Sequence, residues 1–447
     1  MKDPEQGGFP PVGALGDVLP GTGGTSSAAA VNAPVGETAT VRQSASDPRP
    51  HGKKRRKRRR GRKVFARDKA ASPPAESFSH QAADGQLVAA SGSGAAQQVN
   101  GAATTARPVE HVRPPYELPV FAALDLGTNN CRLLVAVPTR PGQFRVIDAF
   151  SRIVRLGEGL SATGRLGQAA MDRAVDALRV CADKLAGRRI ARSRLIATEA
   201  CRAAENGAEF LDRVKAETGL DLEIIDRETE ARLAVSGCGS LIEPGTDGVV
   251  LFDIGGGSSE VALIDVTGRR SPRLAEHIVA WTSLPVGVVS LAERFGGREV
   301  TRQSFGTMID YVAELLQRFE ARHRLGPLGA GARFHLLGTS GTVTTLAGVH
   351  LGLERYDRRR VDGLWMDGGS VDAMIERLLS WDFPMRVANP CIGADRADLV
   401  LGGCAILEAI RAVWPSERLR VADRGLREGI LSELMGEAGV WRGGARR

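Results

Sequence analysis

Cysteine and histidine are too few and too scattered in this sequence to suggest a disulfide framework or a zinc site. The 447 residues include six cysteines and seven histidines, with no Cys-x-x-Cys pair and no metal-ligand spacing of histidines. No run of about 18 apolar residues occurs, so no membrane span is expected. Residues 1–20 lack a basic start followed by an apolar core, so we expect no secretory signal and place the chain in a reducing cytoplasm with free, mostly buried thiols.

Basic charge is distributed unevenly along the chain. Residues 1–118 contain 17 Lys and Arg against 10 Asp and Glu, and so carry +7 of the formal net charge of +8. The remainder is nearly neutral, which argues against a nucleic-acid binder that uses its whole surface. Hydrophobic residues make up 43% of the chain, and its length allows two or three domains.

The first 118 residues are rich in Gly, Ala, Ser, Pro and Gln and are predicted to form a disordered basic tail. Ten of the eleven residues of Lys53–Lys63 are basic. This run has two interpretations: a solvated, self-repelling segment, or an arm that contacts a polyanion such as nucleic acid or polyphosphate. It contains no aromatic residues, so stacking on bases is not indicated.

Alternating strand and helix patterns from Pro119 onward indicate an α/β fold. Three apolar strands precede a helix over residues 166–185, and after Gly245 a similar layout begins again. We therefore predict a first domain over residues 119–245 and a second over residues 246–423. A helix at about 424–439 is predicted to return to the first domain.

Two strand–turn–strand segments 128 residues apart share one pattern. The second, Val249–Val266, reads VVLFDIGGGSSEVALIDV: Asp253 ends a strand and is followed by Gly255, Gly256, Gly257 and Ser258. Consecutive glycines let the backbone approach a ligand and direct N–H groups at an anion, and a neighbouring carboxylate suits a cation. An ordinary glycine-rich hairpin is the alternative. The occurrence of the pattern twice in the chain makes this alternative less favoured.

The first copy carries Asp125, Gly127, Thr128 and Asn129 at the corresponding positions. The residue seven positions after the Asp is Arg132 in this copy and Glu260 in the other. An arginine matches phosphate oxygens, whereas a carboxylate matches Mg²⁺. The first turn is therefore predicted to face phosphate and the second to face metal.

A third small-residue turn, GTSGT, follows a predicted strand and precedes a predicted helix. Gly338, Thr339, Ser340 and Gly341 would then lie at a helix N-terminus, where an anion binds readily. A helix cap without a ligand is the alternative. No Gly-Lys-Ser/Thr follows, so the turn is not a Walker loop.

The ordered set of motifs resembles the exopolyphosphatase / guanosine pentaphosphate phosphatase (Ppx/GppA) family. The set comprises ALDLGTNNCRLL, ATEACRAAENG, the ETEARLAVSG segment, DIGGGSSE, SLPVGVVSLAERF, GTSGTVTTLA, RADLVLGG and DRGLREGIL, over about residues 119–439. The resemblance implies two ribonuclease-H-like domains of the actin, sugar-kinase and heat-shock-chaperone superfold, with the active site in the interdomain cleft. It also implies the short, two-domain form and a homodimer.

The same resemblance implies Mg²⁺-dependent removal of the terminal phosphate from polyphosphate, or of the 5′ γ-phosphate from guanosine pentaphosphate. It assigns the general base to Glu230, catalytic and metal roles to Asp253 and Glu260 with Asp125 as a further metal ligand, and phosphate contacts to Arg202 and Asn206. Departures from the family pattern occur just before the base, at Arg227 and Thr229. A kinase of the superfold and a non-catalytic polyphosphate or nucleotide sensor remain alternative functions.

Overall fold

A computed structural model describes residues 118–268, 271 and 273–441. The predicted tail, including Lys53–Lys63, lies outside the described residues except for Leu118. Within them, no helix is both long enough and apolar enough to cross a bilayer. All six cysteines are free and buried, as predicted.

The first sheet has the strand order β3-β2-β1-β4-β5. Its first three strands form an antiparallel meander, and β4 and β5 continue it in parallel with β1. This is the order expected of the predicted ribonuclease-H-like fold. The strands are β1 (Val120–Leu126), β2 (Asn130–Pro138), β3 (Phe144–Ile153), β4 (Ile190–Ala197) and β5 (Glu223–Ile224).

The second sheet repeats that order and adds one edge strand. Its order is β10-β11-β9-β6-β7-β8, in which β6, β7 and β8 are antiparallel and β9 and β11 run parallel to β6. The predicted repeat and α/β fold class are confirmed. The strands are β6 (Gly248–Ile254), β7 (Ser259–Asp265), β8 (Ile278–Leu284), β9 (Phe334–Thr339), β10 (Trp365–Asp367) and β11 (Arg418–Val421).

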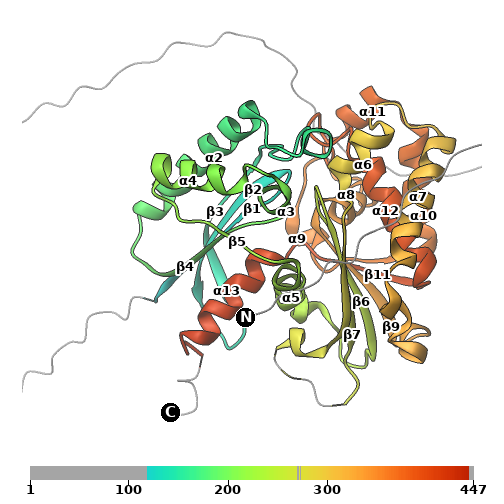
Figure 1. Cartoon of the computed structure of the whole chain (residues 1–447). Helices are drawn as coiled ribbons and strands as arrows, with labels where there is room; N and C mark the ends of the chain where they lie inside the picture. The colour runs from blue at the N-terminus through green and yellow to red at the C-terminus, as the bar shows by residue number, and fades with distance from the viewer. Residues whose placement is uncertain (1–117, 269–270, 272, 442–447) are drawn as a thin grey trace, which may run out of the picture. The chain divides into compact units, whose positions relative to one another are not determined.

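Alternate side chains of β1 face opposite layers, as the period of two in a strand requires. Ala122 and Leu124 pack beneath α2 and α4, whereas Phe121 and Ala123 pack against α13. Figure 1 shows α2 and α4 on one side of this sheet and α13 on the other. Gly187 follows α2 and ends it where predicted, but α4 was not predicted. The helices on this sheet are α1 (Leu160–Thr163), α2 (Gln168–Ala186), α3 (Glu199–Ala203), α4 (Gly207–Thr218) and α13 (Leu426–Glu437).

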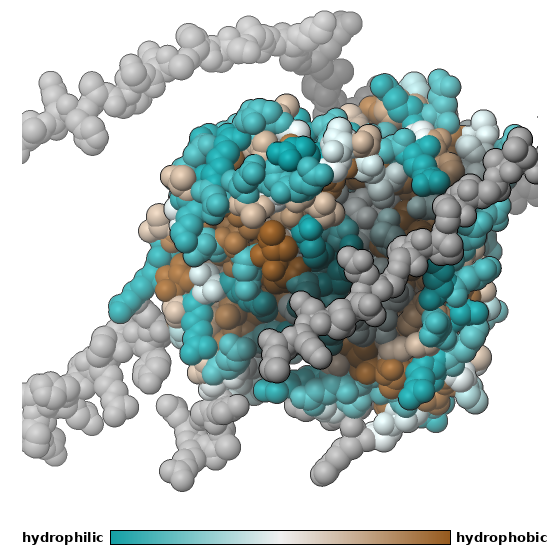
Figure 2. All heavy atoms as spheres, in the orientation of Figure 1, coloured by the Kyte–Doolittle hydropathy of each residue, from teal (hydrophilic) through white to brown (hydrophobic). Residues whose placement is uncertain are grey.

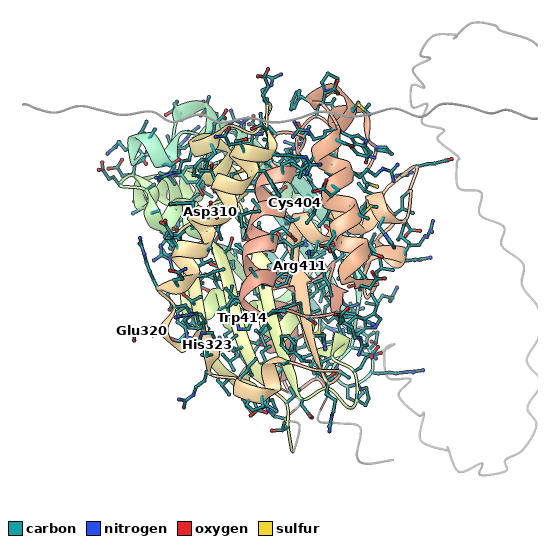
Figure 3. All side chains as sticks on the ribbon, turned by 90° about the vertical axis from the view of Figure 1, so that its right-hand side faces the viewer. Asp310, Glu320, His323, Cys404, Arg411 and Trp414 are labelled. Carbon is teal, nitrogen blue, oxygen red and sulfur yellow. The ribbon has the colours of Figure 1, made fainter. Side chains whose placement is uncertain are left out.

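The second sheet carries the largest core on its outer face. Figure 3 shows α7 and α12 there, with Asp310 on α7 and Cys404 and Arg411 on α12. Trp414, just past α12, donates its indole N–H to the carbonyl of Arg322 at 2.9 Å. The helices are α6 (Val288–Phe295), α7 (Arg302–Gln317), α8 (Ser340–His350), α9 (Arg358–Val361), α10 (Gly368–Ser380), α11 (Phe383–Ala388) and α12 (Val400–Val413); short 3₁₀ turns are η1 (Gly239–Leu241), η2 (Leu274–His277), η3 (Glu320–His323) and η4 (Gly326–Gly329).

Helix α5 (Arg227–Cys238) covers the other face of the second sheet and packs on α13. The two helices cross closely, since a Cβ built on Gly429 of α13 would lie 2.0 Å from the carbonyl oxygen of Leu233 on α5. The C-terminal helix thus packs on the first sheet, and α5 lies between the two sheets. The domain boundaries themselves stay a prediction.

Candidate active site

The two glycine turns have the same cross-strand geometry. Asp125 pairs directly with Arg132 across β1 and β2, and Asp253 pairs directly with Glu260 across β6 and β7. Each turn is closed by a backbone hydrogen bond, from Gly127 to Asn130 at 2.9 Å in the first copy and from Gly255 to Ser258 at 3.0 Å in the second. The spacing of seven residues therefore places Arg132 beside Asp125, and Glu260 beside Asp253, on neighbouring strands.

The two turns contact each other across the gap between the sheets. A Cβ on Gly257 would lie 2.8 Å from Thr128 Oγ1, and one on Gly256 would lie 2.9 Å from Thr128 Cβ and 3.2 Å from the backbone nitrogen of Asn129. Side chains at these two glycines would push the turns apart. Gly256 and Gly257 therefore allow the two turns to approach each other closely, and they also leave the backbone accessible to a ligand.

A cavity of about 660 Å³ opens beside the paired turns and is lined from both sheets. Figure 2 shows hydrophilic residues in the recess between the two halves, next to a hydrophobic patch. Most of the predicted site residues line the cavity: Asp125, Gly127, Thr128, Asn129, Arg132, Glu230, Asp253, Gly255, Gly256, Gly257, Ser258, Glu260, Thr339, Ser340 and Gly341. Sequence motifs separated by more than 200 residues therefore converge on one cavity.

The third turn reaches the cavity through its middle residues only. Ser340 begins α8 in a left-handed conformation, with φ of 76°, and Thr339 Oγ1 donates to the carbonyl of Arg424. Gly338 does not line the cavity. A Cβ there would lie 2.6 Å from the ring of Phe252 and 2.7 Å from Val343. The predicted contact of Gly338 with a ligand is not supported, because a glycine is needed here for close packing against Phe252 and Val343 in the core.

Arg202 was predicted to contact phosphate, but its guanidinium is already occupied by protein groups. Its Nη2 donates to Glu230 Oε2 at 2.9 Å and to Glu199 Oε2 at 2.6 Å, and its Nη1 donates to the carbonyl of Ile225 at 2.6 Å. It is not among the residues that line the cavity. The side chain instead orients Glu230 from behind.

Asn206 also lies away from the cavity. Its side-chain oxygen accepts from the backbone nitrogen of Leu166 at 2.8 Å, and its amide nitrogen donates to the carbonyl of the same residue at 3.1 Å. Both ends of the buried amide are therefore used to fix the chain before α2. A phosphate contact from Asn206 would require breaking both bonds, so this predicted contact is not supported.

Four of the carboxyl groups that line the cavity are predicted site residues, and burial raises the pKa of each of these four. Burial and the neighbouring Asp253 raise the pKa of Glu260 to about 7, and burial and Asp125 raise that of Asp253 to about 6. The pKa of Glu230 is raised well above its usual value by burial and by Glu260, and that of Asp125 is also raised by burial. Carboxyl groups that raise one another's pKa values cannot all ionise without a cost in free energy unless a cation binds among them.

The donor set fits Mg²⁺ shared with a phosphorylated ligand better than a cage made by protein alone. Among residues 118–268, 271 and 273–441, no three His, Cys, Asp or Glu side chains are grouped tightly enough to hold a metal by themselves. Mg²⁺ commonly uses one or two carboxylates together with substrate phosphates and water. The side-chain oxygens of Asn129 and Asn130 are buried without a hydrogen-bond partner and lie in the cavity wall.

Three arginines supply positive charge to the same cavity. Arg132, Arg396 and Arg427 all line it, and no side-chain hydrogen bond or ion pair holds any of them within the described part of the chain. Burial lowers the pKa of Arg396 and of Arg427, and the charge of Arg132 lowers both further. Arginines held close together without ion-pair partners make an anion site. Sequence reasoning found Arg132 alone, although RADLVLGG and DRGLREGIL contain the other two.

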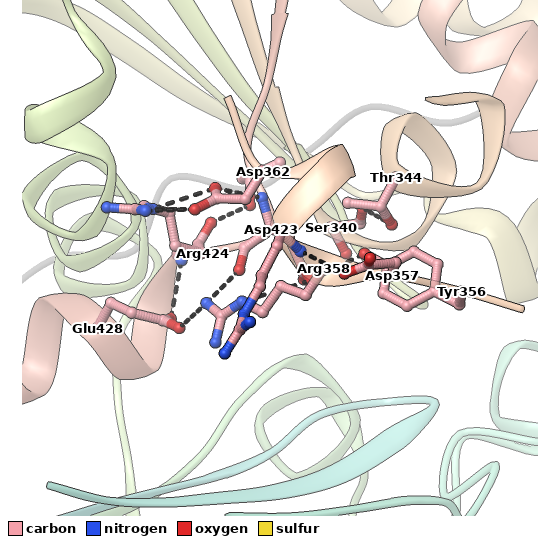
Figure 4. A network of polar contacts seen from close by, with 12 residues as sticks. Ser340, Thr344, Tyr356, Asp357, Arg358, Asp362, Asp423, Arg424 and Glu428 are labelled. Carbon is pink, nitrogen blue, oxygen red and sulfur yellow. Dashed lines mark hydrogen bonds and ion pairs between the residues drawn. The ribbon is translucent and has the colours of Figure 1, made fainter. Parts of the chain in front are cut away.

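Other charges of the wall are neutralised within the protein. Figure 4 shows Tyr356 donating to Asp423 at 2.7 Å, Arg358 donating to Glu428 at 2.7 Å, and Arg424 paired with Asp362. These bonds fix the wall next to the three unpaired arginines. A ligand would therefore meet strong positive charge mainly at Arg132, Arg396 and Arg427.

Comparison with known proteins identifies the family. The model of the Ppx/GppA phosphatase family matches residues 135–438. The chain belongs to the Ppx/GppA phosphatase family. This confirms the predicted family and the hydrolase class.

Several members of the Ppx/GppA family align over most of the described chain. "Exopolyphosphatase 2" of Mycobacterium tuberculosis is 31% identical over 330 residues, covering 70% of this chain and 98% of the relative. "Guanosine-5'-triphosphate,3'-diphosphate pyrophosphatase" of Aeromonas hydrophila is 29% identical, covering 71% of this chain and 60% of the relative. The near-complete overlap with the shorter relative fits the predicted short form.

A solved structure of the family has the same fold. The crystal structure of the Aquifex aeolicus Ppx/GppA family member superposes with a TM-score of 0.59 at 26% identity, covering 72% of this chain and 99% of that chain. An exopolyphosphatase from Cytophaga hutchinsonii gives a TM-score of 0.62 at 24% identity, which shows likeness of fold.

Proposed function

We propose that this Ppx/GppA protein removes the terminal phosphate of inorganic polyphosphate, with Glu230 as the general base. The observation that carries the proposal is the placement of Glu230. Its carboxylate is fixed by Arg202 at 2.9 Å, has a raised pKa, and lines a cavity that also contains three unpaired arginines. A general base works best when its pKa lies near the working pH and its position is fixed.

Binding of the terminal phosphates would use the three cavity arginines and the glycine turns. Arg132, Arg396 and Arg427 would neutralise the phosphate oxygens, and the backbone N–H groups of the turns would add donors. Asp253, Glu260 and Asp125 would share Mg²⁺ with the phosphates of the substrate, and the ion supplies charge neutralisation at the phosphoryl group when bound. The predicted roles of these residues stay proposals.

The reaction would be an in-line displacement by water. Glu230 takes a proton from the water, the water oxygen bonds to the terminal phosphorus, and the bridging P–O bond breaks. The products are orthophosphate and a chain shorter by one unit. Glu230 accepts the proton in its ionised form, which Arg202 favours and which burial and Glu260 oppose.

Charge at the rim of the cavity favours a long polyanion. Arg355, Arg359 and Arg360 are exposed, form no ion pair within the described residues, and flank Tyr356 and Arg358, which line the cavity. The exopolyphosphatase of M. tuberculosis is also matched over 98% of its length. Both observations support polyphosphate as the substrate.

Guanosine pentaphosphate is the second candidate substrate, because one wall of the cavity is apolar. Leu134, Phe150 and Ile153 from β2 and β3 line it and would suit a purine ring. Phosphate release from the two substrates, measured side by side with Mg²⁺, decides between them. A higher kcat/KM for guanosine pentaphosphate than for polyphosphate would select this alternative.

The role of Glu230 is tested by Glu230→Gln, which keeps the size of the side chain and removes the base. We expect release of orthophosphate from polyphosphate to fall about 10³-fold. Glu228→Gln, an exposed residue of the same helix, is the matched control and should retain activity. Equal activity of Glu230→Gln and wild type would leave a binding protein or sensor as the better account, and phosphate transfer from ATP to an acceptor would favour a kinase.

A contact of Lys53–Lys63 with polyanion and assembly as a homodimer also stay proposals. Deletion of residues 1–113 should raise KM for long polyphosphate at low salt and have less effect at higher salt if the basic run captures substrate. Unchanged KM at both salt concentrations would remove that role. Sedimentation of the full chain tests the dimer.

A further inference from the structure

A second set of contacts joins the two halves of the site on the outer side of the glycine turns. Arg155 donates to both carboxylate oxygens of Asp398 at 3.0 Å and to the carbonyl of Asp395 at 3.0 Å. Glu293 of α6 accepts from the backbone nitrogen of Gly159 at 2.8 Å and from the hydroxyl of Ser161. Residues 155–161 follow the first meander, whereas Glu293, Asp395 and Asp398 belong to the second half.

On the first side, these contacts are connected directly to the first glycine turn. The backbone nitrogens of Val154 and Arg155 donate to the carbonyl of Asn129 at 2.9 and 3.1 Å, and that of Gly157 donates to the carbonyl of Thr128 at 2.9 Å. Arg155 has φ of 47°, a left-handed conformation that a residue with a side chain adopts at some cost. The segment is therefore held in a defined shape against the turn.

On the second side, the contacts are connected to the second glycine turn through α6. The backbone nitrogens of Val288 and Val289, at the start of α6, donate to the carbonyls of Gly255 and Gly256 at 3.0 and 2.9 Å. About one and a half turns later, the same helix presents Glu293 to Gly159 and Ser161. The position of the second turn is thereby linked to residues 155–161.

Asp398 is also held in place and lies beside a cavity arginine. Buried Arg386 donates to the carbonyl of Ala397 at 3.0 Å and to that of Gly297 at 3.2 Å, which ties the 395–398 segment to the end of α6. Arg396 in this segment lines the cavity. Its position relative to the first turn thus depends on the ion pair between Arg155 and Asp398.

We propose that Arg155, through Asp398, is a positioning residue that sets the distance between the two glycine turns and holds Arg396 at the phosphate site. This proposal rests on the proposed phosphohydrolase function. Arg155 does not line the cavity, so it acts through other residues. Glu293 forms the second tie of the same kind. Loss of either contact should let the two glycine turns move apart. Phosphate binding should then weaken more than the rate at which bound substrate reacts.

The first test compares kinetics of Arg155→Ala with those of a matched control. We expect KM for polyphosphate to rise about tenfold, since a charge-assisted hydrogen-bonded pair is lost, with a smaller change in kcat. Arg302→Ala removes an exposed ion pair with Glu376 inside the second half and should leave both constants unchanged. The exchanged pair Arg155→Asp with Asp398→Arg should recover part of the lost affinity.

A second readout does not depend on catalysis. Hydrogen exchange of residues 154–161 should speed up in Arg155→Ala and in Glu293→Ala, while that of β1 and β6 should not change. Arg155→Lys keeps the positive charge but has fewer hydrogen-bond donors, so it should give an intermediate KM. This variant replaces Arg155→Ala in the kinetic comparison if Arg155→Ala does not fold. Wild-type KM in Arg155→Ala, or no recovery in the exchanged pair, overturns the proposal; absence of phosphate release by wild type itself counts against the proposed function instead.

Discussion

Arg202 donates a hydrogen bond to Glu230 across 2.9 Å, and the two residues stand on different helices, α3 and α5. The arginine also bonds Glu199 and the carbonyl of Ile225, so its position is fixed from three sides. Burial and Glu260 together raise the pKa of Glu230 well above its usual value, and Arg202 partly offsets that rise. The pair thus gives Glu230 a raised pKa and a fixed orientation, and both properties suit a general base.

Replacing Arg202 should shift the pH dependence of the reaction. Arg202 lowers the pKa of Glu230, whereas burial and Glu260 raise it. In Arg202→Gln the opposing charge is gone, so the pKa rises further and the acidic limb of kcat/KM moves to higher pH. Measured pH–rate profiles for variant and wild type check this. An identical acidic limb in both would show that Arg202 does not act on the titrating group.

Removing a cavity arginine should weaken binding of phosphate. Neither Arg427 nor Arg396 forms an ion pair within the described residues, so neither alanine variant breaks a salt bridge. We expect KM for polyphosphate to rise about tenfold in each variant, and the dependence of KM on salt to become shallower. Arg179→Ala, which removes exposed ion pairs on α2, is the control and should change neither quantity.

The crowded carboxyl groups predict how Mg²⁺ changes stability with pH. The folded-state pKa values of Glu260, about 7, and Asp253, about 6, lie above their ordinary values. Without metal, their contribution to stability is present at low pH and is lost as the pH rises through those values. Thermal unfolding should therefore show a lower Tm at pH 8 than at pH 5, and added Mg²⁺ should raise Tm more at pH 8. An equal effect of Mg²⁺ at both pH values contradicts a metal site on these carboxylates.

The close crossing of α5 and α13 predicts a stability effect at one glycine. Gly429→Ala would place a methyl group 2.0 Å from the carbonyl oxygen of Leu233, so we expect a loss of about 1–3 kcal/mol in the free energy of unfolding. Gly436 lies in the same helix with open space around it. Gly436→Ala should be neutral or more stable by about 0.5–1 kcal/mol. Urea unfolding of both variants measures the difference, and equal stabilities would show that the helices can move apart freely.

Much of the fold could be predicted because its signals are local. The alternation of apolar residues marks the strands, and the repeated Asp-x-Gly pattern marks the paired turns. The cross-strand partners Arg132 and Glu260 could be found because a short hairpin fixes their register against Asp125 and Asp253. Helix α4 escaped prediction because, besides Gly207, Phe210 and Val214 are its only buried residues, too short an apolar stripe to stand out.

Residue roles that depend on distant contacts could not be predicted. Arg202 and Asn206 stand in a phosphate-contact motif, yet they bond Glu230 and Leu166, 28 and 40 residues away. Gly338 stands in a glycine-bracketed turn, yet the ring of Phe252 occupies the space beside it. Arg396 and Arg427 join the site only because α12 and α13 bring their N-terminal ends to the cavity. No local sequence pattern indicates these long-range contacts.

The most direct test of the account is release of orthophosphate from long-chain polyphosphate in ¹⁸O-labelled water with Mg²⁺, for wild type and Glu230→Gln. We predict that wild type shortens the chain one unit at a time, that each released orthophosphate carries one ¹⁸O atom, and that the rate falls about 10³-fold in the variant. Release at an undiminished rate in Glu230→Gln, or orthophosphate without the label, would contradict water attack assisted by Glu230.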